Sequence, residues 1–169
     1  MKRSARLRLA IYSFLGLTLA TGGYWFSQIL QREQQSGAAS HRVRPQEPAR
    51  PYSYDEEEVK FSYPASGAVL AGTLTLPHGT GPHPAVVLIA GTGPHERDSA
   101  QSGHRPFLVL ADHLTRQGIA VLRYDRRGAG RSSGNFKQAT QADFADDTRA
   151  ATEYLARRKE IDPRRIGLV

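Results

Sequence analysis

A glycine-rich segment, Gly91–Asp98 (GTGPHERD), follows an uninterrupted apolar run, Ala85–Ala90. Such a run is typical of a strand that is buried on both faces of a parallel sheet. Glycines directly after a strand let the backbone turn sharply, so that amide N–H groups can face the space above the strand's end. In acyl transfer, amides placed this way stabilise the oxyanion of the tetrahedral intermediate. The same residues also suit a tight Gly/Pro turn that binds no ligand, and both interpretations stay open on this segment alone.

A second segment, Tyr124–Gly134 (YDRRGAGRSSG), follows the next apolar run and contains the pattern G-x-S-x-G at 130–134. In many serine hydrolases this pattern marks the nucleophile, which stands on a strained turn between a strand and the helix that follows at once. Here the residues DRRGA separate the strand from the match, and NFKQA separate the match from the next helix. We therefore interpret Ser132 as a serine of a surface turn and not as a nucleophile.

Neither glycine-rich segment matches a nucleotide-binding pattern. The first lacks the third glycine of G-x-G-x-x-G, and the second has Ser133 at that place. Neither segment passes directly into a helix whose N-terminus could bind a pyrophosphate. The phosphate-binding pattern G-x-x-x-x-G-K-[S/T] does not occur in the sequence. We therefore expect no nucleotide and no other cofactor.

Metal and nucleic-acid binding are not expected either. The six histidines have neither the i, i+4 nor the H-x-H spacing of zinc ligands, and the sequence has no cysteine that could supply a thiolate or a disulfide. Of the net charge of +7, residues 1–50 contribute +6, with eight Lys/Arg and two Asp/Glu, so residues 51–169 are nearly neutral at +1. A nucleic-acid interface needs clustered basic charge on the folded domain. The histidines are His41, His78, His83, His95, His104 and His113.

The elements that must position the two segments predict an α/β fold. Two alternating apolar strands around a Pro-Ala-Ser-Gly turn predict an antiparallel hairpin, and the remaining pattern is β-α-β-α-β with a parallel sheet. Thr140 and Asp143 form a capping box at the start of the second helix, and Asp146-Asp147 are expected on its solvated face. The predicted elements are strands 59–63, 70–76 and 85–90, helix 107–117, strand 119–124, helix 140–159 and a strand that begins at Ile166.

In this order, the GTGPHERD and DRRGAGRSSG segments, the helix DFADDTRAATEYL and the stretch IDPRRIGLV resemble the α/β-hydrolase superfamily. The resemblance is to bacterial esterases and to the serine aminopeptidase-like and dienelactone-hydrolase-like members, and it covers residues 57–169. It implies that the amide of Thr92 contributes to the oxyanion hole, with Gly93 as the alternative donor. It also implies a mainly architectural role for Asp125 and Arg126, which fix the second segment by hydrogen bonds and ion pairs or line the rim of the cleft.

The resemblance further implies that the nucleophilic serine, the acid and the histidine follow the last strand, beyond Val169. We therefore expect this chain to be the N-terminal half of an α/β-hydrolase and to have no hydrolytic activity by itself. The expected function of the parent protein is hydrolysis of small-molecule carboxylic esters, or of amides or peptides. The alternative is a non-catalytic, membrane-anchored binding or interaction protein that uses half of a hydrolase fold.

The first 56 residues are expected to lie outside the folded domain. Four basic residues between Lys2 and Arg8 precede an apolar stretch, 9–30, that ends in Tyr, Trp, Phe, Ile and Leu. This pattern predicts a membrane anchor with the domain on the periplasmic side of the inner membrane, or a signal peptide whose cleavage releases a secreted domain. Residues 31–56 are rich in Gln, Arg, Pro and Ser and predict a disordered linker before a hydrolase domain at 57–169.

Overall fold

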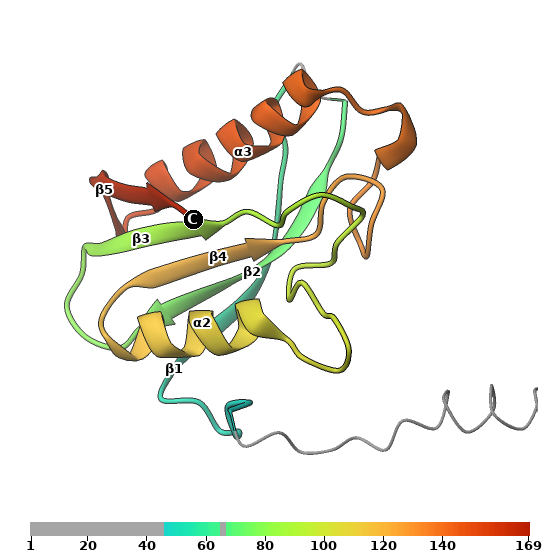
Figure 1. Ribbon diagram of the computed structural model, residues 1–169. Helices are drawn as coiled ribbons and strands as arrows, with labels where there is room; N and C mark the ends of the chain where they lie inside the picture. The colour runs from blue at the N-terminus through green and yellow to red at the C-terminus, as the bar shows by residue number, and fades with distance from the viewer. Residues whose placement is uncertain (1–45, 65–66) are drawn as a thin grey trace, which may run out of the picture. The chain divides into compact units, whose positions relative to one another are not determined.

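The computed structural model describes residues 46–64 and 67–169, which form a five-stranded mixed sheet with a helix on each face. The strand order is β1-β2-β4-β3-β5 (Figure 1). The pairs β1–β2 and β2–β4 are antiparallel, and the pairs β4–β3 and β3–β5 are parallel. The strands are β1 (Tyr54–Phe61), β2 (Leu70–Pro77), β3 (His83–Leu88), β4 (Ala120–Tyr124) and β5 (Ile161–Leu168). The predicted order of an antiparallel hairpin followed by parallel strands is therefore confirmed.

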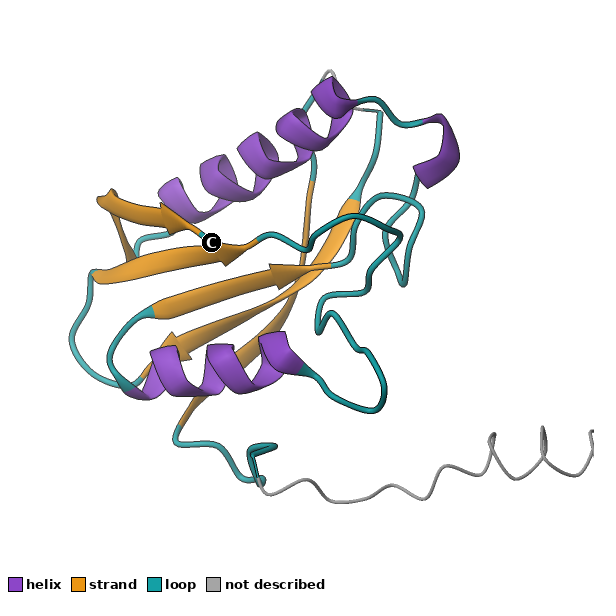
Figure 2. Cartoon of the chain, viewed as in Figure 1, coloured by secondary structure: helices purple, strands orange, loops and turns teal. Residues whose placement is uncertain are grey.

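Helices α2 (Pro106–Arg116) and α3 (Gln141–Ala156) cover opposite faces of this sheet (Figure 2). Successive residues of β4 point to opposite faces, so Val121 packs against α2 while Leu122 belongs to the larger core under α3. Helix α3 contributes Ala151 and Leu155 to that core, and both are fully buried. The α3 face carries the main hydrophobic core, and a smaller cluster lies under α2.

The C-terminal end of α2 and the N-terminal end of α3 follow from local sequence, as expected, whereas α3 ends at Ala156 rather than at 159. Gly118 has a positive φ of 84° just after α2, where a residue with a side chain would be strained. At the start of α3, the Thr140 hydroxyl accepts from the Asp143 amide, and the Asp143 carboxylate accepts from the Thr140 amide. A short 3-10 turn, η1 (Phe136–Gln138), precedes this cap.

Strand β3 is shifted by two residues from the expected 85–90, and three further details differ from the expectation. Strand β1 begins at Tyr54, inside the segment expected to be linker, because the Tyr54 ring is buried against the domain. Strand β5 begins at Ile161 rather than Ile166, with an irregularity in its pairing with β3. Asp147, expected on the solvated face of α3, is 2% exposed because its carboxylate binds Arg127.

Neither helix in residues 46–64 and 67–169 is long and apolar enough to cross a membrane. The predicted anchor or signal segment, residues 1–30, lies outside the described residues, as does most of the predicted linker.

Candidate functional site

The two glycine-rich segments meet at the carboxyl ends of β3 and β4. The Arg126 amide donates to the His95 carbonyl at 3.1 Å, and the Arg97 amide donates to the Asp125 carboxylate at 2.8 Å. Because β3 and β4 are parallel neighbours, their following loops leave the same edge of the sheet. Ligands of α/β sheets bind at this edge.

Asp125 connects the two loops. Its carboxylate accepts from the Arg97 guanidinium through Nε at 3.1 Å and Nη2 at 2.9 Å, from the Arg97 amide, and from the Arg131 amide at 3.0 Å. Burial of the side chain opposes ionisation, but the bonds from Arg97 and the two amides outweigh it and hold the pKa of Asp125 below its ordinary value. A Cβ at Gly130 would lie 2.6 Å from this carboxylate, which explains why glycine stands there. The architectural role expected for Asp125 agrees with these contacts.

The two serines of the G-x-S-x-G pattern attach the second loop to β2. The Ser132 hydroxyl donates to the Asp125 carbonyl at 2.6 Å and accepts from the Ala71 amide at 2.9 Å. The Ser133 hydroxyl accepts from the Val69 amide at 2.8 Å. Both hydroxyls are therefore bound to backbone groups at the start of a strand. This geometry agrees with the interpretation of Ser132 as a turn serine.

Thr92 and Gly93 lie in the loop that follows β3, and Thr92 is exposed. In the part of the chain that the structure describes, neither of their amides donates to a protein acceptor. Gly93 has a φ of 114°, and a Cβ there would lie 3.1 Å from the His95 ring, so a side chain would disturb the loop. The two candidate oxyanion donors thus stand in a loop where, among the described residues, no protein acceptor binds their N–H groups.

The carbonyl groups of the same turn are all bound by side chains. The Arg126 guanidinium donates to the carbonyls of Gly91 and, at 3.4 Å, of Gly93. The Thr92 carbonyl lies 2.7 Å from Nε2 of His95. A carbonyl oxygen only accepts hydrogen bonds, so Nε2 of His95 carries a proton in this contact. His95 therefore contacts the backbone of the turn. Arg126, which belongs to the second glycine-rich segment, binds the backbone of the first.

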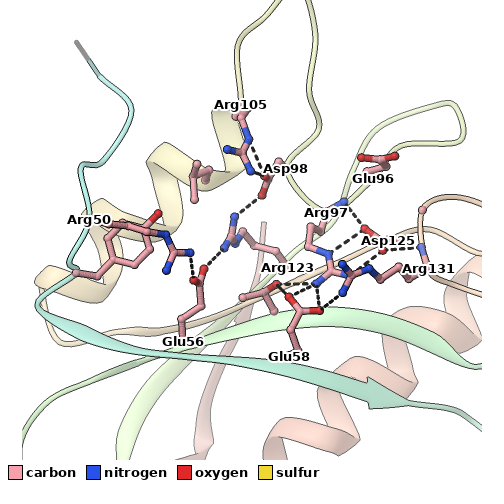
Figure 3. A pocket seen from close by; sticks show the side chains of 14 residues that line it. Arg50, Glu56, Glu58, Glu96, Arg97, Asp98, Arg105, Arg123, Asp125 and Arg131 are labelled. Carbon is pink, nitrogen blue, oxygen red and sulfur yellow. Dashed lines mark hydrogen bonds and ion pairs between the residues drawn. The ribbon is translucent and has the colours of Figure 1, made fainter. Parts of the chain in front are cut away.

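A charged cavity of about 540 Å³ lies beside these loops, on the α2 face of the sheet, and sequence reasoning missed it (Figure 3). At its centre the buried guanidinium of Arg123 binds Asp98 and, at 3.2 Å, Glu56. Next to it, Arg97 binds Glu58 at 2.8 Å as well as Asp125. The signal was one arginine inside the apolar strand AVLRY, where a charged side chain must find buried partners.

Most of the charged side chains around this cavity are paired with each other. Arginine and carboxylate side chains alternate from Arg50 through Glu56 and Arg123 to Asp98 and Arg105. These ion pairs tie β1 to the loop after β3. The arrangement supports the loop that carries Thr92 from one side, and we assign it a positioning role.

Comparison with known proteins identifies the family. The family model described as serine aminopeptidase, S33, matches residues 80–167, which include both loops and all three parallel strands. The curated protein Esterase EstD of Thermotoga maritima is 31% identical over 111 residues, covering 66% of this chain and 26% of that protein.

Solved structures share the fold. A hypothetical protein from Pseudomonas aeruginosa is 25% identical with a TM-score of 0.57, over 69% of this chain and 35% of that one. An esterase of Pyrococcus furiosus is 22% identical with a TM-score of 0.53, over 69% of this chain and 40% of that one. The chain thus spans about a quarter of the curated relative and less than half of either structure. By its matched residues and its sheet, the chain belongs to the serine aminopeptidase family of the α/β-hydrolase superfamily.

Proposed function

We propose that this chain forms the oxyanion-binding part of a serine hydrolase that cleaves carboxylic esters. The observation that carries the proposal is the exposed turn after β3, in which the Thr92 and Gly93 amides have no acceptor among the described residues. Such amides at the carboxyl end of a parallel strand suit a developing negative charge on oxygen. The likeness to Esterase EstD supports an ester substrate, and the family description leaves peptide substrates as the second candidate.

In the proposed reaction, a serine oxygen attacks the ester carbonyl carbon while a histidine takes its proton. The carbonyl oxygen becomes an oxyanion and accepts hydrogen bonds from the Thr92 amide, with the Gly93 amide as the alternative or second donor. The carbon–oxygen bond of the ester breaks, the alcohol leaves with the proton from histidine, and water then releases the acid from the acyl-serine. We propose that the serine, the histidine and its acidic partner are supplied by residues that follow Val169.

The test is hydrolysis of p-nitrophenyl acetate and butyrate by the protein expressed from its complete gene, beside leucine p-nitroanilide as a peptidase substrate. We expect ester turnover that a serine-directed sulfonyl fluoride abolishes, and no turnover by the polypeptide 1–169 expressed alone. Turnover of the anilide in preference to the esters would favour a peptidase. Absence of inhibitor-sensitive turnover on all three substrates would contradict the proposal.

Replacing Ser132 with alanine is expected to leave kcat within about two-fold of the parent and to lower the free energy of unfolding by about 1–3 kcal/mol. The variant removes two hydrogen bonds to backbone groups, to the Ala71 amide and the Asp125 carbonyl, but no reacting atom. Ester kinetics and urea denaturation of the same preparation measure both effects. Loss of turnover with unchanged stability would show instead that Ser132 is the nucleophile.

We also propose that residues 9–30 attach the protein to the inner membrane, with the domain on the periplasmic side. The basic residues before this apolar stretch support the orientation. Carbonate washing of isolated membranes and protease treatment of spheroplasts test it. Recovery of a shortened protein in the soluble periplasmic fraction would indicate a cleaved signal peptide instead.

A further inference from the structure

Three successive carbonyl groups, those of Gly91, Thr92 and Gly93, each accept a hydrogen bond from a side chain. Arg126 supplies the first and third of these bonds, and His95 supplies the second. Turns exposed to solvent commonly leave such carbonyls to water. Binding all three by side chains therefore fixes the orientation of three consecutive peptide groups.

The peptide bonds of this turn are trans, so the N–H of each peptide points away from its C=O. The carbonyl of Gly91 shares its peptide group with the amide of Thr92, and the carbonyl of Thr92 shares its group with the amide of Gly93. The carbonyl of Gly93 is followed by Pro94, which has no N–H. The carbonyls of the turn therefore face Arg126 and His95. The amides of Thr92 and Gly93 point to the opposite side of their peptide groups.

Arg126 is itself held in place. Its guanidinium lies over the Phe144 ring at 4.1 Å from the centroid and 5.5 Å from that of Phe136. Its backbone amide donates to the His95 carbonyl, so Arg126 binds the turn at His95 through its main chain and at Gly91 through its side chain. The side chain is half-buried, which strengthens its hydrogen bonds to the carbonyls.

We propose that Arg126 is a positioning residue of the oxyanion hole. It orients the Gly91–Thr92 peptide and draws electron density toward the Gly91 oxygen, which makes the Thr92 N–H a stronger donor. His95 acts in the same way on the Thr92–Gly93 peptide. This inference rests on the proposed function and adds to it a side chain that does not touch the substrate.

The test compares ester kinetics of Arg126→Gln and Arg126→Lys with the parent, all expressed from the complete gene. Oxyanion stabilisation acts in the transition state, so we expect Arg126→Gln to lower kcat about 10- to 100-fold and to change KM by less than about two-fold. Lysine keeps the charge but has a single donor nitrogen in place of the guanidinium fork, so Arg126→Lys should recover part of the loss. Arg157→Gln, which removes an exposed arginine paired with Glu153 on α3, is the matched control and should change neither constant.

A second measurement is independent of catalysis. In ¹H–¹⁵N spectra of labelled protein, Arg126→Gln should shift the Thr92 amide toward the position of an amide in an unpolarised peptide, while Arg157→Gln should not move it. Unchanged kcat, equal loss in the lysine and glutamine variants, or an unmoved Thr92 amide would overturn the proposal. If the parent hydrolyses no substrate, the proposed function fails, and the Thr92 amide shift alone decides whether Arg126 polarises the turn.

Discussion

Replacing Asp147 with asparagine is expected to lower the free energy of unfolding by about 3–5 kcal/mol, the cost of breaking a buried ion pair from one side. The Asp147 carboxylate is 2% exposed and binds the Arg127 guanidinium through two parallel bonds, at 2.8 and 2.7 Å. Arg127 is buried as well, so a neutral partner leaves its buried charge only partly compensated. Asp143 binds Nη1 of Arg127 at 2.8 Å, and this carboxylate continues to balance part of the charge of Arg127 in the variant.

Urea denaturation monitored by circular dichroism measures this loss of unfolding free energy. Replacement of the neighbouring aspartate, Asp146→Asn, is the matched control. Asp146 is only partly buried on the same helix, so its replacement should change the stability by less than about 0.5 kcal/mol. The double variant Arg127→Met, Asp147→Leu removes both charges and should be more stable than Asp147→Asn alone. Equal stability of Asp147→Asn and Asp146→Asn would mean that the buried pair does not hold the second loop against α3.

The error about Asp147 shows the limit of sequence reasoning in this fold. The spacing of Phe144, Ala151 and Leu155 predicts the buried stripe of α3 from local periodicity alone. An aspartate on that stripe looks solvated until its partner is known, and Arg127 lies twenty residues earlier, in a loop. The buried position of Arg123 in β4 has the same cause, because its partners Asp98 and Glu56 come from another loop and another strand.

The candidate site, too, could be predicted only in part from the sequence. Glycines at 91 and 93 after an apolar run were enough to predict a turn at the end of β3, because backbone freedom is a local property. The choice of the Thr92 and Gly93 amides as oxyanion donors came from the resemblance to α/β-hydrolases and stays a prediction. The side chains that bind the carbonyls of that turn could not be assigned, since Arg126 reaches it from the next strand's loop. Asp125 was expected to be architectural, but its partner Arg97 belongs to the other glycine-rich segment. Local patterns located the loops, and long-range ion pairs determine how they are held.

Asp125→Asn is expected to destabilise the protein by about 2–4 kcal/mol at pH 7. The substitution removes the charge that accepts two bonds from the Arg97 side chain and two from backbone amides. Arg97 is 13% exposed and, among the described residues, keeps Glu58 as its remaining carboxylate partner. Because Asp125 joins the loop after β4 to the turn that carries Thr92, ester turnover should fall together with stability.

The effect of pH provides a sharper check. The pKa of Asp125 lies below its ordinary value in the folded protein, so the carboxylate contributes its full stabilisation above the unfolded pKa, about 4. This contribution is lost as the pH falls through the lower, folded pKa. The difference in unfolding free energy between the parent and Asp125→Asn should therefore be constant from pH 7 to about pH 5 and shrink below pH 4. Asp55→Asn removes a carboxylate that is 70% exposed and, as the control, should not show the loss of stability at pH 7. A difference that stays constant down to pH 3 would mean that the bonds from Arg97 do not depend on the charge of Asp125, and that the two loops are held by the backbone contacts alone.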